Sequence, residues 1–198
     1  MAHVKFTIAG ISPLLMNRFT DAAAEAATRG TRTSVLSGDR GTPREQAQKK
    51  LYVDDAGTIG IPQPNLFRCI IDGGAFFKSG KSKITTQKSS LIPACVAIEG
   101  VILPLKYRDD WQVDVRPVRI PSTGGRILCY RPVFYDWSLS AVAELDDEMI
   151  DAKLFRQILD AAGKRIGIGD FRPACKGPYG RFVVDQWQVQ VAPLKAVA

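Results

Sequence analysis

The sequence predicts an α+β fold with a ferredoxin-like, RNA-recognition-like βαββαβ core, long basic loop insertions and an added β-hairpin. Three patterns support this prediction. Apolar and polar residues alternate near the N-terminus, apolar residues recur every four positions near residue 155, and a Pro-Ser-Thr-Gly-Gly turn separates two strand-like runs. With 198 residues and an apolar fraction of 45%, the chain has the size of a single globular domain, so wholesale disorder is excluded.

The first half of the chain is predicted to supply the first strand and the first helix of the core. Alternation over residues 4–8 predicts a half-buried strand that ends at Gly10. The Pro-Asn pair at 64–65 is typical of a helix start, and apolar residues continue at helical spacing to about Lys78. The remaining segments are an insertion over 17–57 with short helices at 21–27 and 43–51, a short strand at 58–61, and a basic loop over 79–90.

The second half is predicted to supply the other three strands and the second helix. We expect this helix to begin at Asp146 or Asp147, because acids cluster there and favour the positive end of a helix dipole. Its apolar residues recur every four positions, which predicts one buried face. The expected strands are 96–105, broken at Gly100, then 137–145 and 181–191, followed by a loose tail over 193–198.

A hairpin insertion is predicted over residues 111–132. Its strands cover 113–120 and 126–132 and flank the glycine-containing turn. Both strands carry arginines, and we expect these to line up on one polar face. They are Arg116, Arg119, Arg126 and Arg131.

The net charge of +7 lies mainly in the first half of the chain, where residues 1–90 hold 13 basic and 7 acidic residues. Two stretches rich in Gly, Ser and Thr, 29–50 and 78–88, carry most of the excess and are predicted to be loops. Lysine and arginine replace the counterions of a phosphate backbone, and hydroxyl groups donate to its oxygens. The charge pattern is therefore typical of a nucleic-acid-binding protein, but also of a basic protein with solvated loops.

The composition argues against several other classes of function. The chain has one histidine, and its four cysteines are widely spaced, so no zinc site and no cysteine–histidine nucleophile is predicted. We expect reduced, mostly buried thiols and no cofactor. The apolar runs are far shorter than a roughly 20-residue membrane span. No apolar signal core follows the N-terminus, so the expected location is the cytoplasm.

The segment 166–182 is the most distinctive stretch of the sequence. It alternates glycines with the cations Arg172, Lys176 and Arg181 and with the aromatic residues Phe171 and Tyr179. Glycines allow a backbone to approach a ligand closely, cations hold phosphates, and aromatic faces stack on bases. It matches neither a Walker loop nor a dinucleotide fingerprint. The simpler alternative is a helix-to-strand connection whose aromatic rings fill the core.

Two motifs resemble those of a known family. The helix end followed by G-x-G, a basic-aromatic stretch and G-R-F-x-V over 166–184 resembles the RAMP superfamily. This superfamily comprises ferredoxin-like RNA-binding proteins, including the backbone subunits of multi-subunit CRISPR effector complexes. The run IGIPQPNLFR over 59–68 resembles the short strand, proline turn and helix start of the same group. The runs SPLLMNR, IGDFRP and GRFVV also resemble small uncharacterised proteins encoded by bacteriophages.

The resemblance implies a single RAMP-like domain that acts as a non-catalytic backbone subunit and oligomerises along a guide RNA in a CRISPR-type effector complex. Its partners would be single-stranded RNA, further copies of the chain and other effector subunits. Arg68, Arg172, Lys176 and Arg181 are expected to hold phosphates, with Phe171 or Tyr179 stacking on a base. Loop cations would extend this track or contact a neighbouring subunit: Arg40, Arg44, Lys49, Lys50, Lys78, Lys81 and Lys83.

Three alternatives stay open at this point. The same charges suit a phage protein that binds or anneals single-stranded DNA. A structural or assembly protein without nucleic acid would use exposed aromatic residues and the hairpin arginines as subunit interfaces. An RNA-cleaving enzyme would use Asp21 or Asp39, although each also reads as a loop acid that offsets nearby arginines.

Overall fold

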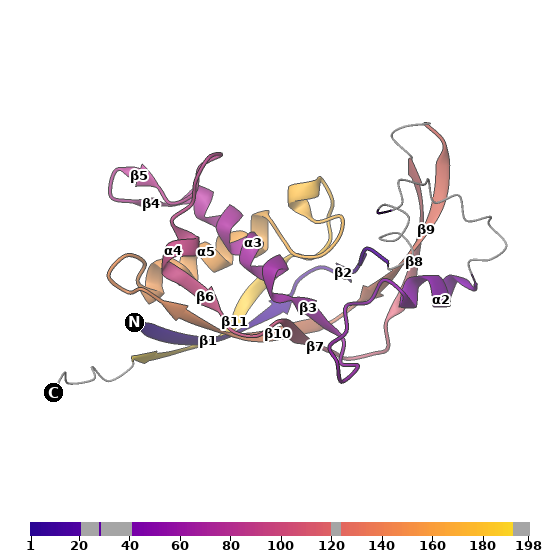
Figure 1. Cartoon of the computed structure of the whole chain (residues 1–198), viewed down its shortest axis with the longest axis horizontal. Coiled ribbons are helices and arrows are strands. Elements are labelled where there is room, and N and C mark those ends of the chain that lie inside the picture. Colours follow the sequence, from indigo (N-terminus) through magenta and orange to yellow (C-terminus); the bar gives the residue numbers. More distant parts are fainter. Residues whose placement is uncertain (21–27, 29–40, 120–123, 192–198) are drawn as a thin grey trace.

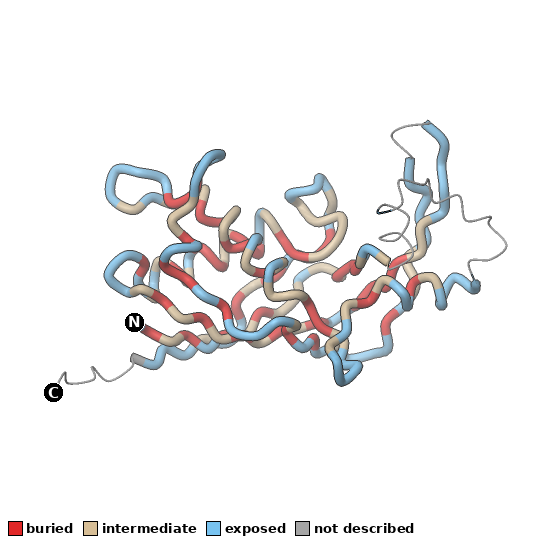
Figure 2. The backbone as a smooth tube through the Cα atoms, viewed as in Figure 1, coloured by how far each residue is buried: buried red, intermediate tan, exposed pale blue. Residues whose placement is uncertain are grey.

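The computed structural model describes residues 1–20, 28, 41–119 and 124–191 (Figure 1). A layer of helices covers one face of an antiparallel sheet, and a two-stranded arm extends away from one end of that sheet (Figure 1). Buried residues concentrate between the helices and the sheet, whereas the outer part of the arm is exposed (Figure 2). The α+β class predicted from the sequence is confirmed.

The central sheet has the strand order β11-β1-β10-β7-β3, with β6 also paired to β10. All of these pairings are antiparallel. The strand predicted over 96–105 forms as two strands, and Gly100 lies between them with a φ of 91°. The strands are β11 (Phe182–Val191), β1 (Ala2–Gly10), β10 (Trp137–Leu145), β7 (Ile102–Tyr107), β3 (Gly60–Pro62) and β6 (Val96–Ile98).

Strand β1 has the two faces that its alternation predicts. Val4, Phe6 and Ile8 are buried, and the Phe6 ring lies 6.1 Å from that of Phe155 on helix α5. Lys5 is exposed on the opposite face, because successive side chains of a strand point to opposite sides. One face of the sheet therefore packs under the helices and the other is left uncovered.

Two glycines set how closely the helical layer packs. Helix α3 (Gln63–Gly73) continues into the 3₁₀ turn η2 (Gly74–Phe76), which ends just short of the predicted Lys78. A Cβ at Gly73 would lie 2.7 Å from the Cβ of Ala162 on α5 (Ala152–Arg165), and a Cβ at Gly163 would lie 2.3 Å from the carbonyl oxygen of Phe182 on β11. These weak helix formers lie where α3, α5 and β11 meet, so close contact explains them.

The start predicted for the second helix is wrong by several residues. Asp151 is the N-cap, and its Oδ1 accepts the backbone N–H of Leu154 at 2.7 Å. Asp147 instead forms an ion pair with the N-terminal ammonium group at 2.8 Å. Residues 146–150 form a turn that buries Ile150 before the helix begins. The acids at 146–148 therefore belong to this turn and not to the first turn of the helix.

The predicted hairpin forms the arm of Figure 1, with β8 (Gln112–Arg119) paired to β9 (Arg126–Phe134). Strand β2 (Leu14–Leu15) pairs with the base of β9, and helix α2 (Pro43–Gln48) contacts both strands. The expectation of one arginine face is wrong. Arg116 pairs with Cys129 and Arg119 with Arg126, and residues three apart on a strand point to opposite faces.

The other predicted segments are shorter than expected or lie outside the described residues. Helix α2 ends at Gln48 rather than at residue 51, and the basic loop contains a small hairpin of β4 (Lys78–Ser79) and β5 (Ser82–Lys83). The predicted helix 21–27 and the tail 193–198 lie outside the described residues. The remaining elements are α4 (Ile92–Cys95) and η3 (Pro173–Cys175). Within the described ranges, no helix is long and apolar enough to cross a membrane.

We expect Gly163→Ala to lower the free energy of unfolding by about 1–3 kcal/mol, although alanine is the better helix former. The added Cβ has no room against the Phe182 carbonyl oxygen. Urea unfolding followed by circular dichroism measures the change. Gln157→Ala, at an exposed position of the same helix, is the control and should stay within about 0.5 kcal/mol. A Gly163→Ala protein as stable as the parent would contradict this packing.

Candidate nucleic-acid interface

Two neighbouring cavities lie between helix α3, the C-terminal loop 166–181 and the arm, on the side of the arm that carries Arg116 and Arg131. The first has a volume of about 240 Å³ and is lined by Asn17, Tyr52, Asn65, Arg68, Cys69, Asp72, Ile168, Gly169, Asp170 and Arg172. The second has a volume of about 690 Å³ and is lined by Asn17, Arg116, Pro117, Val118, Arg119, Cys129, Arg131, Asp170, Phe171 and Cys175. Because they share Asn17 and Asp170, they adjoin each other.

The C-terminal loop is held in place by backbone hydrogen bonds to the segment after β1. The N–H of Asp170 donates to the carbonyl oxygen of Leu15, and the N–H of Gly180 donates to that of Pro13, each at 2.8 Å. Gly180 has a φ of 67°, and a Cβ there would collide with the Ile168 carbonyl oxygen. Glycine is therefore needed where the two ends of the loop cross. This crossing fixes the residues of the loop that line both cavities.

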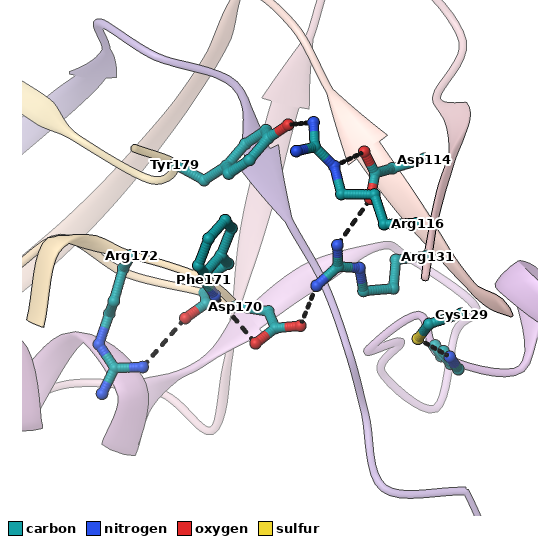
Figure 3. A network of polar contacts seen from close by, with 10 residues as sticks. Asp114, Arg116, Cys129, Arg131, Asp170, Phe171, Arg172 and Tyr179 are labelled. Atoms are coloured by element: carbon teal, nitrogen blue, oxygen red, sulfur yellow. Dashed lines mark hydrogen bonds and ion pairs between the residues drawn. The ribbon is translucent and has the colours of Figure 1, made fainter. Parts of the chain in front are cut away.

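Arg131 on β9 joins the arm to the C-terminal loop (Figure 3). Its side chain is only 7% exposed, and its two terminal nitrogens lie 2.7 Å from Asp114 Oδ2 and 2.8 Å from Asp170 Oδ2. Burial acts to lower the pKa of Arg131, but its hydrogen bonds to the two carboxylates outweigh burial and raise it. Arg131 therefore stays cationic, although its buried Nε has no partner among the described residues.

Arg116 lies beside Arg131 on the same face of the arm. Its Nε donates to Asp114 Oδ1 at 2.8 Å, and it also forms a hydrogen bond with the hydroxyl group of Tyr179 (Figure 3). The Arg116 guanidinium lies 5.2 Å from the centre of the Tyr179 ring. The arm and the loop therefore meet a second time, through a cation on an aromatic face.

Helix α3 forms one wall of the first cavity. Asn65, Arg68 and Asp72 occupy positions i, i+3 and i+7, which fall on one side of a helix. Arg68 Nε donates to Asp72 Oδ1 at 3.0 Å. From the C-terminal loop, Arg172 lines the same cavity and donates to the carbonyl oxygen of Gly169 at 3.1 Å. The buried side chains of Cys69 and Ile168 supply the apolar part of the lining.

The structure brings together three of the residues predicted to bind nucleic acid. Arg68 and Arg172 line the first cavity and Phe171 lines the second. Tyr179 is nearby but only 9% exposed, and its ring packs in a small core cluster with Leu15 and Val133. Phe171 is half-buried, with its ring 6.1 Å from that of Tyr179. Phe171 is therefore the ring better placed to meet a base.

Three other predicted cations, on the C-terminal loop, on α2 and just after α2, already contact protein groups. Arg181 donates to the carbonyl oxygen of Lys164 at 3.2 Å, and Lys176 is exposed at the end of η3. On α2, Arg44 pairs with Asp110 at 2.5 Å and lies over the Trp111 ring. Near the arm, Lys50 Nζ lies 3.1 Å from Cys129 Sγ.

Among the described residues, the remaining predicted cations line neither cavity. Lys49 is exposed just after α2. Lys78, Lys81 and Lys83 lie on the β4–β5 hairpin, at the opposite end of the molecule from the arm (Figure 1). Arg40, Asp21 and Asp39 lie outside the described residues. Within the described residues, the cations of the β4–β5 hairpin are thus separated from those near the arm (Figure 1).

The sequence prediction missed several residues of the site. Arg116 and Arg131 were recognised on the hairpin but were not assigned to binding, and Asn17, Asn65 and Asp72 were not singled out for it. Alternate residues of a strand point to the same face, so the hairpin pairing puts Arg116 and Arg131 on one face and Arg119 and Arg126 on the other. This alternation could have identified Arg116 and Arg131 as neighbours from the sequence. No local pattern joins Arg131 to Asp170, because the two residues meet only through tertiary packing.

The uncovered face of the sheet has a different chemistry. On its central strands β1 and β10 it presents hydroxyl groups, and Thr7 Oγ1 lies 2.9 Å from Ser140 Oγ. RNA-recognition domains stack bases on aromatic residues of the sheet. The Thr7 and Ser140 side chains offer hydroxyl groups at the centre of this face instead. Among the described residues, no group of three or more His, Cys, Asp or Glu side chains could hold a metal ion. The two cavities are therefore the candidate interface.

No protein-family model matches the sequence, and neither does any curated protein. The fold is similar to that of a chain in the Type III-B Cmr-beta bound to cognate target RNA, solved by cryo-EM, with a TM-score of 0.58 and 10% identity. The match covers 95% of the present chain and 60% of that chain. At this level of identity the likeness shows the fold alone.

A second solved structure, Cmr6 from Pyrococcus furiosus, has a TM-score of 0.36 and 13% identity over 92% of this chain and 98% of its own.

We expect Arg131→Met to lower the free energy of unfolding by about 3 kcal/mol, because Asp114 and Asp170 would lose their shared cation inside the protein. Urea unfolding measures this change. Arg126→Met, at an exposed position on the other face of the arm, should cost less than about 0.5 kcal/mol. Equal effects of the two substitutions would show that the buried bridge contributes nothing.

The four thiols, which are free, should react with iodoacetamide at pH 8 in an order set by burial. Cys69 and Cys95 are buried, burial raises the pKa of both, and so little reactive thiolate forms. Cys175 is exposed and should react first. Peptide mass mapping over time measures each rate. Labelling of Cys69 as fast as that of Cys175 would contradict the packing around α3.

Proposed function

We propose that the chain is a non-catalytic RNA-binding subunit of a CRISPR-type effector complex, and that it holds single-stranded RNA between α3, the C-terminal loop and the arm. The observation that supports this most directly is the convergence of arginines from these three elements on two adjoining cavities. Arg68, Arg172 and Arg116 come from α3, the loop and β8 respectively. Their forked guanidinium groups suit phosphate oxygens.

The core supports the proposal through its connections. We infer a ferredoxin-like arrangement in which β1, β6–β7, β10 and β11 are the four strands and α3 and α5 the two crossover helices. The strand order β11-β1-β10-β7 is compatible with it, with β3 added at the edge. The fold likeness to a chain of the target-RNA-bound Cmr-beta favours RNA over other polymers.

The arm supports the assembly part of the proposal. Val115 and Leu128 are about half exposed on one face of the arm, and Val118 and Ile127 on the other. Exposed apolar residues on both faces of a projecting hairpin suit contact with a neighbouring subunit. We infer that copies of the chain line up along the RNA, each arm reaching toward the next copy.

The proposal gives no residue a catalytic role. The acids that an RNA-cleaving alternative would use, Asp21 and Asp39, lie outside the described residues. An assay for divalent-dependent RNA cleavage separates the two ideas. Cutting that disappears in Asp39→Ala would replace the binding role with an enzymatic one.

We expect a fluorescent 30-nucleotide RNA to bind the protein with an affinity that falls linearly with salt on a log–log scale. Arg172→Ala should flatten this slope by about 0.7, the contribution of one phosphate contact on a single strand. Lys153→Ala, an exposed cation on α5, serves as the control and should leave the slope unchanged. Fluorescence anisotropy from 50 to 300 mM salt measures both.

Each other outcome points to a different role. Equal or tighter binding of a single-stranded DNA with the same sequence would favour the phage DNA-binding alternative. No binding of either polymer at 50 mM salt, together with a stable oligomer, would favour a structural role. In the proposed complex, bound RNA should also slow the labelling of Cys129 and Cys175, which line the second cavity.

A further inference from the structure

The first cavity contains groups that phosphate binding does not explain. Asp72 is a carboxylate, which repels phosphate, and it lines the cavity together with Asn17 and Asn65, whose amides both donate and accept hydrogen bonds. The side chain of Asp72 is 28% exposed, whereas that of its ion-pair partner Arg68 is 69% exposed. The acid therefore lies deeper than the cation, so a ligand meets the cation first.

The size and lining of the cavity match one flat ring. Its volume is about 240 Å³, below the roughly 300–1,000 Å³ of pockets for drug-sized ligands. The cavity is therefore too small for a stretch of polynucleotide. Cys69 and Ile168, both almost completely buried, give it an apolar part. The polar side chains of Asn17, Asn65 and Asp72 line the same cavity. An unpaired base needs an apolar surface against its ring face and polar groups at its ring edges.

The two arginines of this cavity come from different elements. Arg68 belongs to α3 and is tied to Asp72, and Arg172 belongs to the C-terminal loop and is tied to the Gly169 carbonyl oxygen. Both keep further N–H groups for phosphates, since a guanidinium carries five donors. A strand whose phosphates contact both arginines therefore passes over the cavity and can turn one base into it.

We propose that the first cavity accepts one unpaired base of the bound RNA and that Asp72 selects bases with an exocyclic amino group. This inference rests on the proposed RNA-binding function. Cytosine offers its N4 amino group to the carboxylate, as adenine and guanine can offer theirs. Uracil has a carbonyl oxygen in place of the cytosine amino group, so two acceptors would face each other and Asp72 would gain no hydrogen bond beyond the one it accepts from Arg68.

The test compares oligo(C) and oligo(U) of twelve nucleotides, which have the same backbone and ring size. We expect the parent protein to bind oligo(C) about tenfold more tightly, as one good hydrogen-bonded contact to a base edge allows. Asp72→Asn should bring the ratio to one or invert it, because an amide N–H can donate to the uracil carbonyl oxygen. Anisotropy at a single salt concentration measures each ratio.

Asp160→Asn is the matched control. Asp160 forms the same i,i+4 ion pair with an arginine, Arg156, at 3.3 Å on α5, but it does not line the cavity. Its substitution removes the same charge and should leave the preference for oligo(C) intact. Because both variants gain one unit of positive charge, any general rise in affinity cancels in the ratio.

The outcomes separate this inference from the function on which it rests. Equal binding of both oligomers by the parent overturns base selection but leaves RNA binding standing. An Asp72→Asn protein that keeps the tenfold ratio shows that Asp72 only pairs with Arg68, and it also overturns the inference. Failure of the parent to bind any RNA removes the proposed function itself.

Discussion

The buried guanidinium of Arg131 is the contact on which the geometry of the candidate site depends. It holds Asp114 of the arm and Asp170 of the C-terminal loop at 2.7 and 2.8 Å, although these residues are far apart in the sequence. Ion pairs of this kind often contribute little net stability, because both charges lose water. Their directional hydrogen bonds can instead fix how two elements lie. Here they set the position of the arm against the loop, and with it the shape of the second cavity.

The helices and the sheet provide the rigid part of the molecule. Close packing at Gly73 and Gly163 locks α3 and α5 onto the sheet, so the walls that these elements give to the site do not depend on a ligand. The arm is different, because its outer half contacts little of the core (Figure 2). A rigid wall opposite a projecting hairpin suits a ligand that is long and varied in shape, such as a single strand.

The arginines and the carboxylates of the candidate site have different roles. In the proposed RNA-binding role, the arginines would supply affinity that does not depend on sequence, because every nucleotide carries a phosphate. The carboxylates do two other things: Asp114 and Asp170 position Arg131, and Asp72 faces a cavity large enough for one ring. Specific contacts to a base require such groups, because phosphate contacts carry no sequence information. Acids among arginines are thus consistent with a site that both holds and discriminates.

The sequence by itself determined the periodic parts of the fold. The alternation in β1, the four-residue repeat of α5, the hairpin and the glycine-rich loop follow from local spacing, and all four form where that spacing predicts them, apart from the start of α5. Residue type and setting also singled out Arg68, Arg172 and Phe171, which the structure places at the two cavities. Only the tertiary structure decided that Asp151 caps α5, that Arg131 bridges two distant acids, and that Asp72 lines a cavity. Periodicity reports which side of an element is buried, whereas partners across the fold depend on how the elements pack against one another.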